Sequence, residues 1–164
     1  MEISMDNSPV NEGNVVVIYR QLLQQWNKRN AAGFAGLFTE NGTLIGFDGS
    51  QINGRKEIYA VLDEIFTHHP TAGYVSIVNE VRMLAPGSAM LLAAAGMVGE
   101  GHTDITPAVN AIQTLVVTAE NNQPRIALFQ NTPAAYHGRP ELVGQLSADL
   151  RLALVEYLSE VPNR

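Results

Sequence analysis

The sequence has no cysteine among its 164 residues. This absence excludes disulfide bonds, thiolate nucleophiles and cysteine-ligated metal sites. Because disulfides are typical of oxidising compartments, the composition is compatible with a reducing cytoplasm, which is the location we expect. Residues 1–6 also lack a basic stretch followed by an apolar core, so the start of the sequence does not resemble a secretory signal.

Charge and long apolar runs are also scarce. Lys and Arg number 10 against 16 Asp and Glu, so the formal net charge is −6. Nothing supplies the basic stripe that a phosphate backbone requires, and we expect no nucleic-acid partner. The longest apolar run, residues 89–98, is too short to span a bilayer, and we expect no membrane partner. Glycine-rich nucleotide motifs and metal-ligand spacings are absent as well, so we expect no cofactor and no metal.

Hydrophobic residues are abundant at 46%, enough for one domain with a sizeable core. Residues 1–13 are polar and predict a flexible tail. Residues 14–136 carry the helical and strand patterns of the main domain. Residues 137–164 form a C-terminal helical extension, in which leucines recur every four positions from Leu142 to Leu154.

Apolar residues recur with a period near 3.6 in three early segments, 14–28, 30–38 and 54–67, which predicts three helices. A strand over 42–47 separates the last two. After Pro70 the period changes to two, which predicts strands near 75–83, 89–98, 108–119 and 125–132. In the first of these, Val75, Ile77, Val81 and Met83 share one face. The predicted fold class is α+β, with a curved antiparallel sheet packed on three N-terminal helices and a C-terminal helix added.

The order and spacing of these segments resemble the nuclear transport factor 2-like fold, a cone with a pocket between sheet and helices. Within that superfamily the sequence resembles the SgcJ/EcaC group of SnoaL-like proteins. The stretches that carry the resemblance are 22–27, 34–39, 47–49, 53–55 and 125–132. The resemblance implies a small-molecule ligand and a homodimer that uses the outer face of the sheet.

Asp48 is the first candidate catalytic residue. The resemblance implies this role, because in the related steroid isomerases an Asp after the equivalent strand removes a proton next to a carbonyl group. Such a base needs an apolar wall that raises its pKa, and Leu44, Ile45 and Phe47 could provide one. The alternative is that Asp48 and Gly49 form a tight turn, in which both residue types are favoured for backbone reasons.

His102 is the second candidate catalytic residue. It lies close to Asp104 between two predicted strands, and a carboxylate can orient an imidazole. The alternative is a solvated loop histidine. His68 and His69 stand at the end of a predicted helix, where they are expected to cap its last carbonyl groups.

Aromatic residues on the helical stripes could form pocket walls, core, or both. Polar residues that interrupt apolar strands either bond each other across the sheet or face a ligand. Asn110 and Gln113 have opposite parity and cannot line the same pocket. The predicted ligand-binding residues are Trp26, Phe34, Phe38, Phe47, Tyr59, Phe66, Asn79, Met83, Asn110 and Gln130.

Three hypotheses for the function follow. The first is a dimeric pocket protein that binds an apolar or carbonyl-bearing small molecule. The second is a cofactor-independent isomerase or cyclase that uses Asp48 as its general base. The third is a structural or interaction module that acts through the sheet face and the C-terminal helix.

Overall fold

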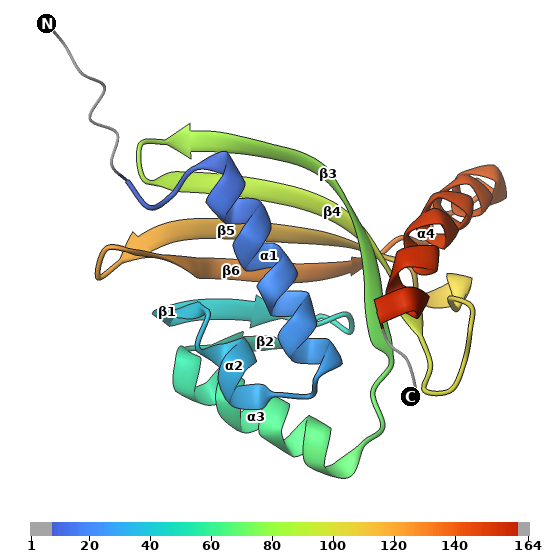
Figure 1. Ribbon diagram of the computed structural model, residues 1–164, viewed down its shortest axis with the longest axis horizontal. Coiled ribbons are helices and arrows are strands. Elements are labelled where there is room, and N and C mark those ends of the chain that lie inside the picture. The colour runs from blue at the N-terminus through green and yellow to red at the C-terminus, as the bar shows by residue number, and fades with distance from the viewer. Residues whose placement is uncertain (1–7, 161–164) are drawn as a thin grey trace, which may run out of the picture.

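The computed structural model describes residues 8–160. Residues 1–7 of the predicted tail and Pro162, which was expected to end the last helix, lie outside this range. Figure 1 shows the helices and strands in their chain order. They are α1 (Glu12–Asn27), α2 (Ala31–Ala35), β1 (Phe38–Ile45), β2 (Gln51–Asn53), α3 (Arg55–His68), β3 (Gly73–Ala85), β4 (Ser88–Val98), the 3₁₀ helix η1 (Pro107–Val109), β5 (Ala111–Glu120), β6 (Gln123–Pro133) and α4 (Pro140–Glu160).

The strands form a six-stranded sheet in the order β2-β1-β6-β5-β4-β3. All neighbouring strands are antiparallel except β1 and β6, which run parallel. The prediction of a wholly antiparallel sheet was therefore wrong. The parallel pair joins segments more than 80 residues apart in the sequence, and periodicity within each segment carries no information about such pairing.

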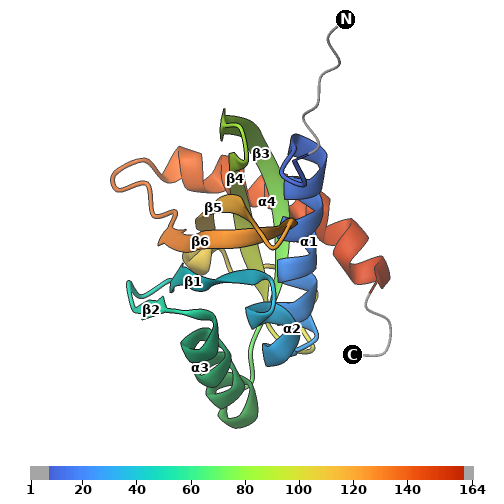
Figure 2. The same ribbon diagram turned by 90° about the vertical axis from the view of Figure 1, so that its left-hand side faces the viewer.

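The helices cover both faces of the sheet (Figure 2). On the inner face, α1 packs across β3, β4 and β6, and α2 and α3 pack against each other beside it. The three predicted helices are present, and a strand precedes the last of them as expected. They do not form an N-terminal group ahead of the sheet, however, because that strand, β1, pairs with β2 and β6 within the sheet and α3 follows it. The predicted C-terminal helix is present as α4, which contacts β3 and β4 from the opposite, outer face. None of the helices within residues 8–160 is both long and apolar enough to cross a membrane.

The first helix begins earlier than the sequence pattern indicated. Asn11 is the N-cap, and its side chain accepts a hydrogen bond of 2.8 Å from the Asn14 backbone N–H. Val10 precedes the cap and is fully buried in the core. Val10 and the first residues of α1 therefore belong to the folded domain, although they fall within the segment predicted as a flexible tail.

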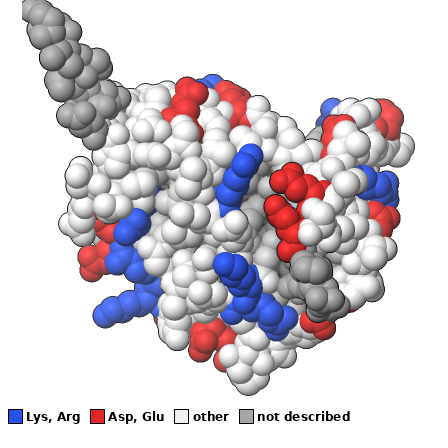
Figure 3. Space-filling view, viewed as in Figure 1, with Lys and Arg blue, Asp and Glu red and all other residues white. Residues whose placement is uncertain are grey.

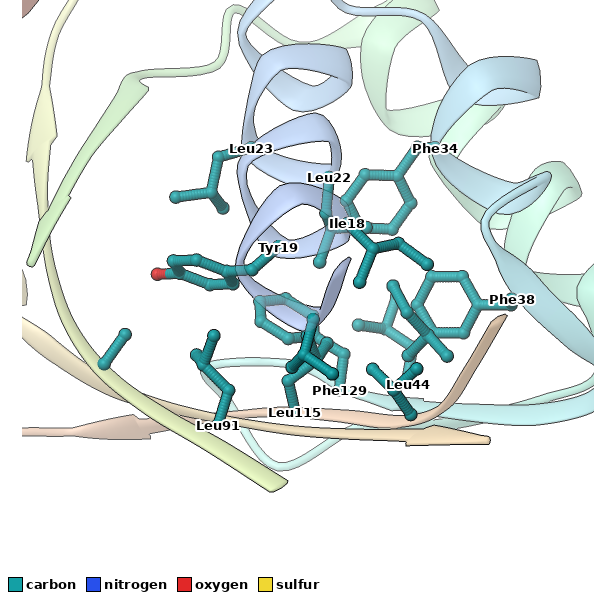
Figure 4. Close-up of a cluster of buried hydrophobic side chains, with 14 of the residues drawn as sticks. Ile18, Tyr19, Leu22, Leu23, Phe34, Phe38, Leu44, Leu91, Leu115 and Phe129 are labelled. Atoms are coloured by element: carbon teal, nitrogen blue, oxygen red, sulfur yellow. The ribbon is translucent and has the colours of Figure 1, made fainter. Parts of the chain in front are cut away.

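The main core lies between α1 and the inner face of the sheet. Figure 4 shows Tyr19 and Leu22 of α1 among buried side chains from the strands, including Leu115 and Phe129. A second cluster on the outer face holds α4 against β3 and β4 through its buried Leu150. Each buried leucine contributes about 1.5–3 kcal/mol from the removal of its side chain from water.

A β-bulge at Asn79 changes which face the residues of β3 occupy. Val78 pairs with Ala93, but Glu80 pairs with Leu92, so Asn79 is an extra residue without an opposite partner. The prediction of one shared face was therefore wrong. Before the bulge, Val75 and Ile77 face α4 on the outside, and after it, Val81 and Met83 face the inner core.

Gly42 allows β1 to approach β6 closely. A Cβ atom at this position would lie 2.8 Å from the carbonyl oxygen of Ile126. We expect Gly42→Ala to lower the free energy of unfolding by about 1–3 kcal/mol, because the backbone of β6 would have to move. The matched control is Gly144→Ala in α4, which meets no atom within 4 Å. It should stabilise the protein by roughly 0.5–1 kcal/mol. Urea denaturation measures the free energy of unfolding of both variants. Equal changes in the two variants would contradict a close approach of β1 to β6 at Gly42.

Candidate functional site

A cavity of about 380 Å³ lies between the inner face of the sheet, the β1–β2 hairpin and α3. An engineered apolar cavity of about 150 Å³ accommodates benzene, so this one has room for a larger, multi-ring molecule. The lining is mostly apolar, with few polar groups. Its residues are Trp26, Phe34, Leu44, Gly46, Phe47, Asp48, Ser50, Ile52, Val61, Leu62, Ile65, Tyr74, Met97, Phe129 and Asn131.

Aromatic rings form much of the cavity wall. The Trp26 ring lies 5.3 Å from that of Tyr74 and 6.2 Å from that of Phe34, measured between centroids. The tilted arrangement of these rings is one that aromatic pairs favour. The indole N–H of Trp26 donates a hydrogen bond of 2.8 Å to the Ala72 carbonyl. This bond fixes the orientation of the indole, so the wall is formed before any ligand arrives.

Asn131 and Tyr74 supply the polar groups on the inner part of the lining. Asn131 of β6 is 9% exposed, and its Oδ1 accepts a hydrogen bond of 2.8 Å from Nε2 of the fully buried Gln113 on β5. Burial raises the pKa of Tyr74 to about 12, and a hydrogen bond with Asn131 opposes this increase. The Tyr74 phenol is therefore neutral at physiological pH. A carbonyl oxygen is a suitable partner for such groups.

Asp48 lies at the exposed rim of the cavity. Its Oδ1 accepts a hydrogen bond of 2.9 Å from the Ser50 backbone N–H, within the turn that links β1 to β2. This bond, together with one from the Ser50 side chain, lowers the pKa of Asp48. The apolar wall expected to raise the pKa does not surround the carboxylate. The turn geometry predicted as the alternative is present, and Gly49 adopts a positive φ of 90° in it.

His102 lies in the exposed loop between β4 and η1, away from the cavity lining. The expected partnership with Asp104 is absent from the described contacts of both residues. Asp104 instead binds Arg151 of α4, with its two carboxylate oxygens 3.0 and 3.2 Å from the guanidinium nitrogens. The hydrogen bond from Arg151 is the main reason that the pKa of Asp104 is lowered. This loop therefore anchors α4.

The structure brings together four of the twelve predicted site residues at the cavity, namely Trp26, Phe34, Phe47 and Asp48. Two further aromatic residues, Phe38 and Phe66, pack in or against the core behind the wall. The side chain of Tyr59 is 45% exposed on α3. Met83 packs against the core near the far end of β3.

The polar strand residues in the predicted site lie elsewhere. Asn79 is exposed in the bulge. Asn110 is buried beneath α4, where its Nδ2 donates a hydrogen bond of 3.0 Å to the Ser147 hydroxyl. Gln130 lies between the cavity-lining Phe129 and Asn131, so alternation places it on the outer face.

Tyr74 is the main cavity residue that the sequence did not single out. Its parity places it on the face opposite Val75, whereas the predicted ligand-binding residues of this strand, Asn79 and Met83, have the parity of Val75. Only the bulge at Asn79 explains why Tyr74 and Met83 face the same side. The prediction that Asn110 and Gln113 do not line the same pocket agrees with the structure: Gln113 bonds Tyr19 of α1 on the inner side of the sheet, whereas Asn110 bonds Ser147 of α4 on the outer side.

Charged side chains do not gather at the cavity. Figure 3 shows acidic and basic groups in small, separate areas on the face that carries α1. Within residues 8–160, no three His, Asp or Glu side chains come together in an arrangement that could hold a metal ion. Apart from the Asp48 carboxylate at the rim, the cavity lining therefore consists of aromatic rings, aliphatic groups and a few neutral hydrogen-bonding groups.

A scan of protein-family models gives no match to the sequence, and a search of curated proteins gives none either. Solved structures do match. A Nostoc punctiforme domain of unknown function with a cystatin-like fold is 23% identical, with a TM-score of 0.72, and the match covers 97% of this chain and 98% of that one. The two molecules thus share their architecture over almost their entire length.

Other similar structures belong to the same broad group. An NTF-2 like protein of unknown function from Shewanella oneidensis is 17% identical, with 72% of this chain and 95% of that one covered and a TM-score of 0.60. A ketosteroid isomerase-like protein from Erwinia carotovora is 14% identical, with coverage of 76% and 96% and a TM-score of 0.60. At these identities the likeness shows the fold alone. The chain has a cystatin-like, nuclear transport factor 2-like fold.

Proposed function

We propose that this protein binds an apolar small molecule bearing a carbonyl group in the cavity between sheet and helices. The single observation that carries the proposal is the cavity itself, whose aromatic wall includes the neutral hydrogen-bonding pair of Tyr74 and Asn131. Ligand sites in proteins are typically concave and mostly apolar, with a few polar groups that fix orientation. The finer resemblance to the SgcJ/EcaC group of SnoaL-like proteins agrees with this role.

Filling the cavity should abolish binding. Val61 of α3 lines it, and Val61→Phe adds a ring to the space that the ligand needs. We expect the affinity for the bicyclic ketone 1-tetralone to fall at least tenfold. The emission of Trp26, the only tryptophan in the sequence, reports binding because this residue lies in the wall.

The matched control for this substitution is Val155→Phe on α4. Val155 is 70% exposed and lies outside the cavity lining, so the same change there should leave the affinity for 1-tetralone unaltered. If 1-tetralone does not bind the unaltered protein, or binds Val61→Phe equally well, the cavity is not the ligand site.

A second candidate function is a cofactor-independent isomerase or cyclase with Asp48 as base. Two observations favour it: Asp48 belongs to the cavity lining, and the solved structures of similar fold include a ketosteroid isomerase-like protein. The lowered pKa of Asp48 keeps the carboxylate ionised and makes it a weak base. A base of this kind requires a substrate whose C–H bond is already acidic.

This candidate predicts that the protein accelerates exchange of the hydrogens next to the carbonyl of 1-tetralone in deuterated water. Asp48→Asn should then slow the exchange by a factor of about 10²–10⁴ and leave the affinity unchanged. Because the pKa of Asp48 is lowered, the exchange due to this residue should stay constant from about pH 5 upward. Nuclear magnetic resonance follows the exchange. Equal exchange rates in the unaltered protein and in Asp48→Asn would show that Asp48 is not the base.

We propose further that the protein is a homodimer through the outer face of the sheet. Beyond the area that α4 covers, this face carries apolar, half-buried side chains on three adjacent strands. They are Met90 and Leu92 of β4, Val116 of β5 and Leu128 of β6. A second copy that presents the same strip would cover them by two-fold symmetry. This pairing leaves the inner cavity open to a ligand.

The homodimer predicts that Val116→Arg yields a monomer, because a charge would be placed in the centre of the paired faces without a partner. Light scattering at micromolar concentration measures the molar mass. The control is Val155→Arg on the exposed side of α4, which should leave the dimer intact. If Val155→Arg alone produced a monomer, α4 rather than the sheet would hold the partner.

A further inference from the structure

A second hollow lies between α1 and α4, along the free edge of the sheet. β3 is the last strand of the sheet, so one side of its backbone has no neighbouring strand. The hollow has a volume of about 290 Å³ and a mostly polar lining, which shares only Tyr74 with the lining of the apolar cavity. In Figure 3 a basic group over α1 faces acidic groups beside the end of α4 across this hollow.

One end of the strand edge in this hollow is already paired. The Tyr74 backbone N–H donates to Oδ1 of Asn27 over 2.8 Å, and the Tyr74 carbonyl oxygen accepts from Nδ2 of the same residue over 3.2 Å. The Asn27 side chain of α1 therefore takes the place of a neighbouring strand at Tyr74. The hydroxyl of Tyr157 on α4 occupies the place that a Cβ atom of Gly73 would take. Asn27 and Tyr157 thus close the hollow at this end.

Ser76 lies two residues farther along the same edge and is open to the hollow. β3 pairs with β4 without interruption from Gly73 to Val78. In an antiparallel pair, backbone groups that point the same way recur at every second residue, so the Ser76 N–H and C=O point away from β4, as those of Tyr74 do. Within residues 8–160 no strand lies on that side. The backbone of Ser76 is therefore available to an incoming strand.

The two walls of the hollow carry opposite charges. Arg20 lies on the α1 wall, and Glu156 and Glu160 lie on the α4 wall. Among the residues that the structure describes, none of these three side chains takes part in an ion pair. One positive and two negative charges sum to −1, so the hollow favours a segment with a net positive charge.

The alternation of side chains along an added strand decides which charge meets which wall. Tyr74 faces the inner side of the sheet, where α1 packs, and Ser76 has the same parity, whereas Val75 faces α4. In an antiparallel pair, the residue opposite Ser76 points to the same side as Ser76, and its two neighbours point to the other side. The residue opposite Ser76 therefore meets Arg20, and its neighbours meet the two glutamates.

We propose that this hollow binds an extended segment of a partner protein, which pairs with Ser76 as an added antiparallel strand and carries an acidic residue between two basic ones. Added strands of this kind gain affinity from backbone hydrogen bonds and specificity from alternate side chains. A second copy of this protein does not fit, because its own β3 is flanked by α1 and α4. Beyond the bulge at Asn79, the exposed charges of Glu80 and Arg82 discourage strand pairing, which restricts the site to the hollow.

The experiment compares two peptides of the same composition and net charge. In acetyl-Thr-Lys-Glu-Lys-Glu-Lys-Thr-amide the charges alternate, and in acetyl-Thr-Lys-Lys-Lys-Glu-Glu-Thr-amide they do not. We expect the alternating peptide to bind roughly three- to tenfold more tightly at low salt, because only its side chains meet opposite charges on both walls. Fluorescence polarisation, with a fluorescein group in place of the acetyl group, measures both affinities.

Arg20→Glu tests the charge on the α1 wall. Arg20 is exposed, so the substitution leaves the core intact. We expect the preference for the alternating peptide to disappear, because its acidic residue would then meet a like charge. The matched control is Lys56→Glu on α3, which makes the same change in charge at an exposed position outside the hollow and should keep the preference.

Nuclear magnetic resonance tests the backbone pairing separately from the charges. With saturating alternating peptide, hydrogen exchange of the Ser76 backbone N–H should slow by roughly tenfold or more, because this group then donates to the peptide. The Tyr74 backbone N–H, which already donates to Asn27, should change little.

Each result supports the added strand or overturns it. If neither peptide binds at millimolar concentration, if both bind equally, or if Arg20→Glu and Lys56→Glu weaken the preference equally, the hollow is not a site for such a segment. If the preference is present but the exchange of the Ser76 N–H is unchanged, the peptide contacts the helices alone and the added strand is overturned. If Arg20→Glu converts a homodimer to a monomer, a second copy rather than a partner occupies the hollow. None of these results bears on the binding of 1-tetralone in the apolar cavity.

Discussion

The hydrogen bond between Tyr19 and Gln113 is the interaction on which the site depends. Gln113 points into the apolar space between α1 and the sheet, where an amide without partners would cost roughly 1–3 kcal/mol. Its oxygen is satisfied only because α1 brings a phenol to it, and its nitrogen is satisfied only because β6 places Asn131 opposite. These two hydrogen bonds thus require that α1, β5 and β6 all pack in one arrangement.

The cavity exists because the helices cover the sheet unevenly. α1 packs closely on β3, β4 and β6, and its apolar stripe fills the space above them. α3 packs instead against β1 and β2, at the other edge of the sheet. Its residues Val61, Leu62 and Ile65 line the cavity that remains between α3 and the sheet. The aromatic rings of the lining border this cavity but do not fill it. The same side chains therefore serve as core on one side and as ligand wall on the other.

Local periodicity was enough to predict the long helices, most of the long strands and the α+β class, whereas the pocket was implied by the resemblance to the nuclear transport factor 2-like fold. It failed where pairing is non-local: the parallel contact of β1 with β6 and the three-residue strand β2 leave no repeating pattern. It also failed at Asn79, since one inserted residue reverses the face of everything beyond it. This reversal explains why Tyr74 was not predicted. The parity assigned to Gln113 held, because β5 pairs with β4 without interruption in this region.

Asp48 was a candidate base because of the resemblance to the steroid isomerases, in which an Asp after the equivalent strand removes a proton next to a carbonyl group. In the structure, the turn that exposes Asp48 also stabilises its charge, so its tendency to take a proton is reduced. Tyr74 and Asn131, by contrast, are buried and neutral, and each is held in place: Gln113 donates to Oδ1 of Asn131, and the Tyr74 backbone N–H donates to Asn27. In surroundings of low dielectric, a fixed hydrogen-bond donor acts more strongly than it would in water. A carbonyl-bearing ligand of the kind proposed would therefore find its neutral hydrogen-bonding partners in the interior of the cavity, whereas the carboxylate stands at the rim.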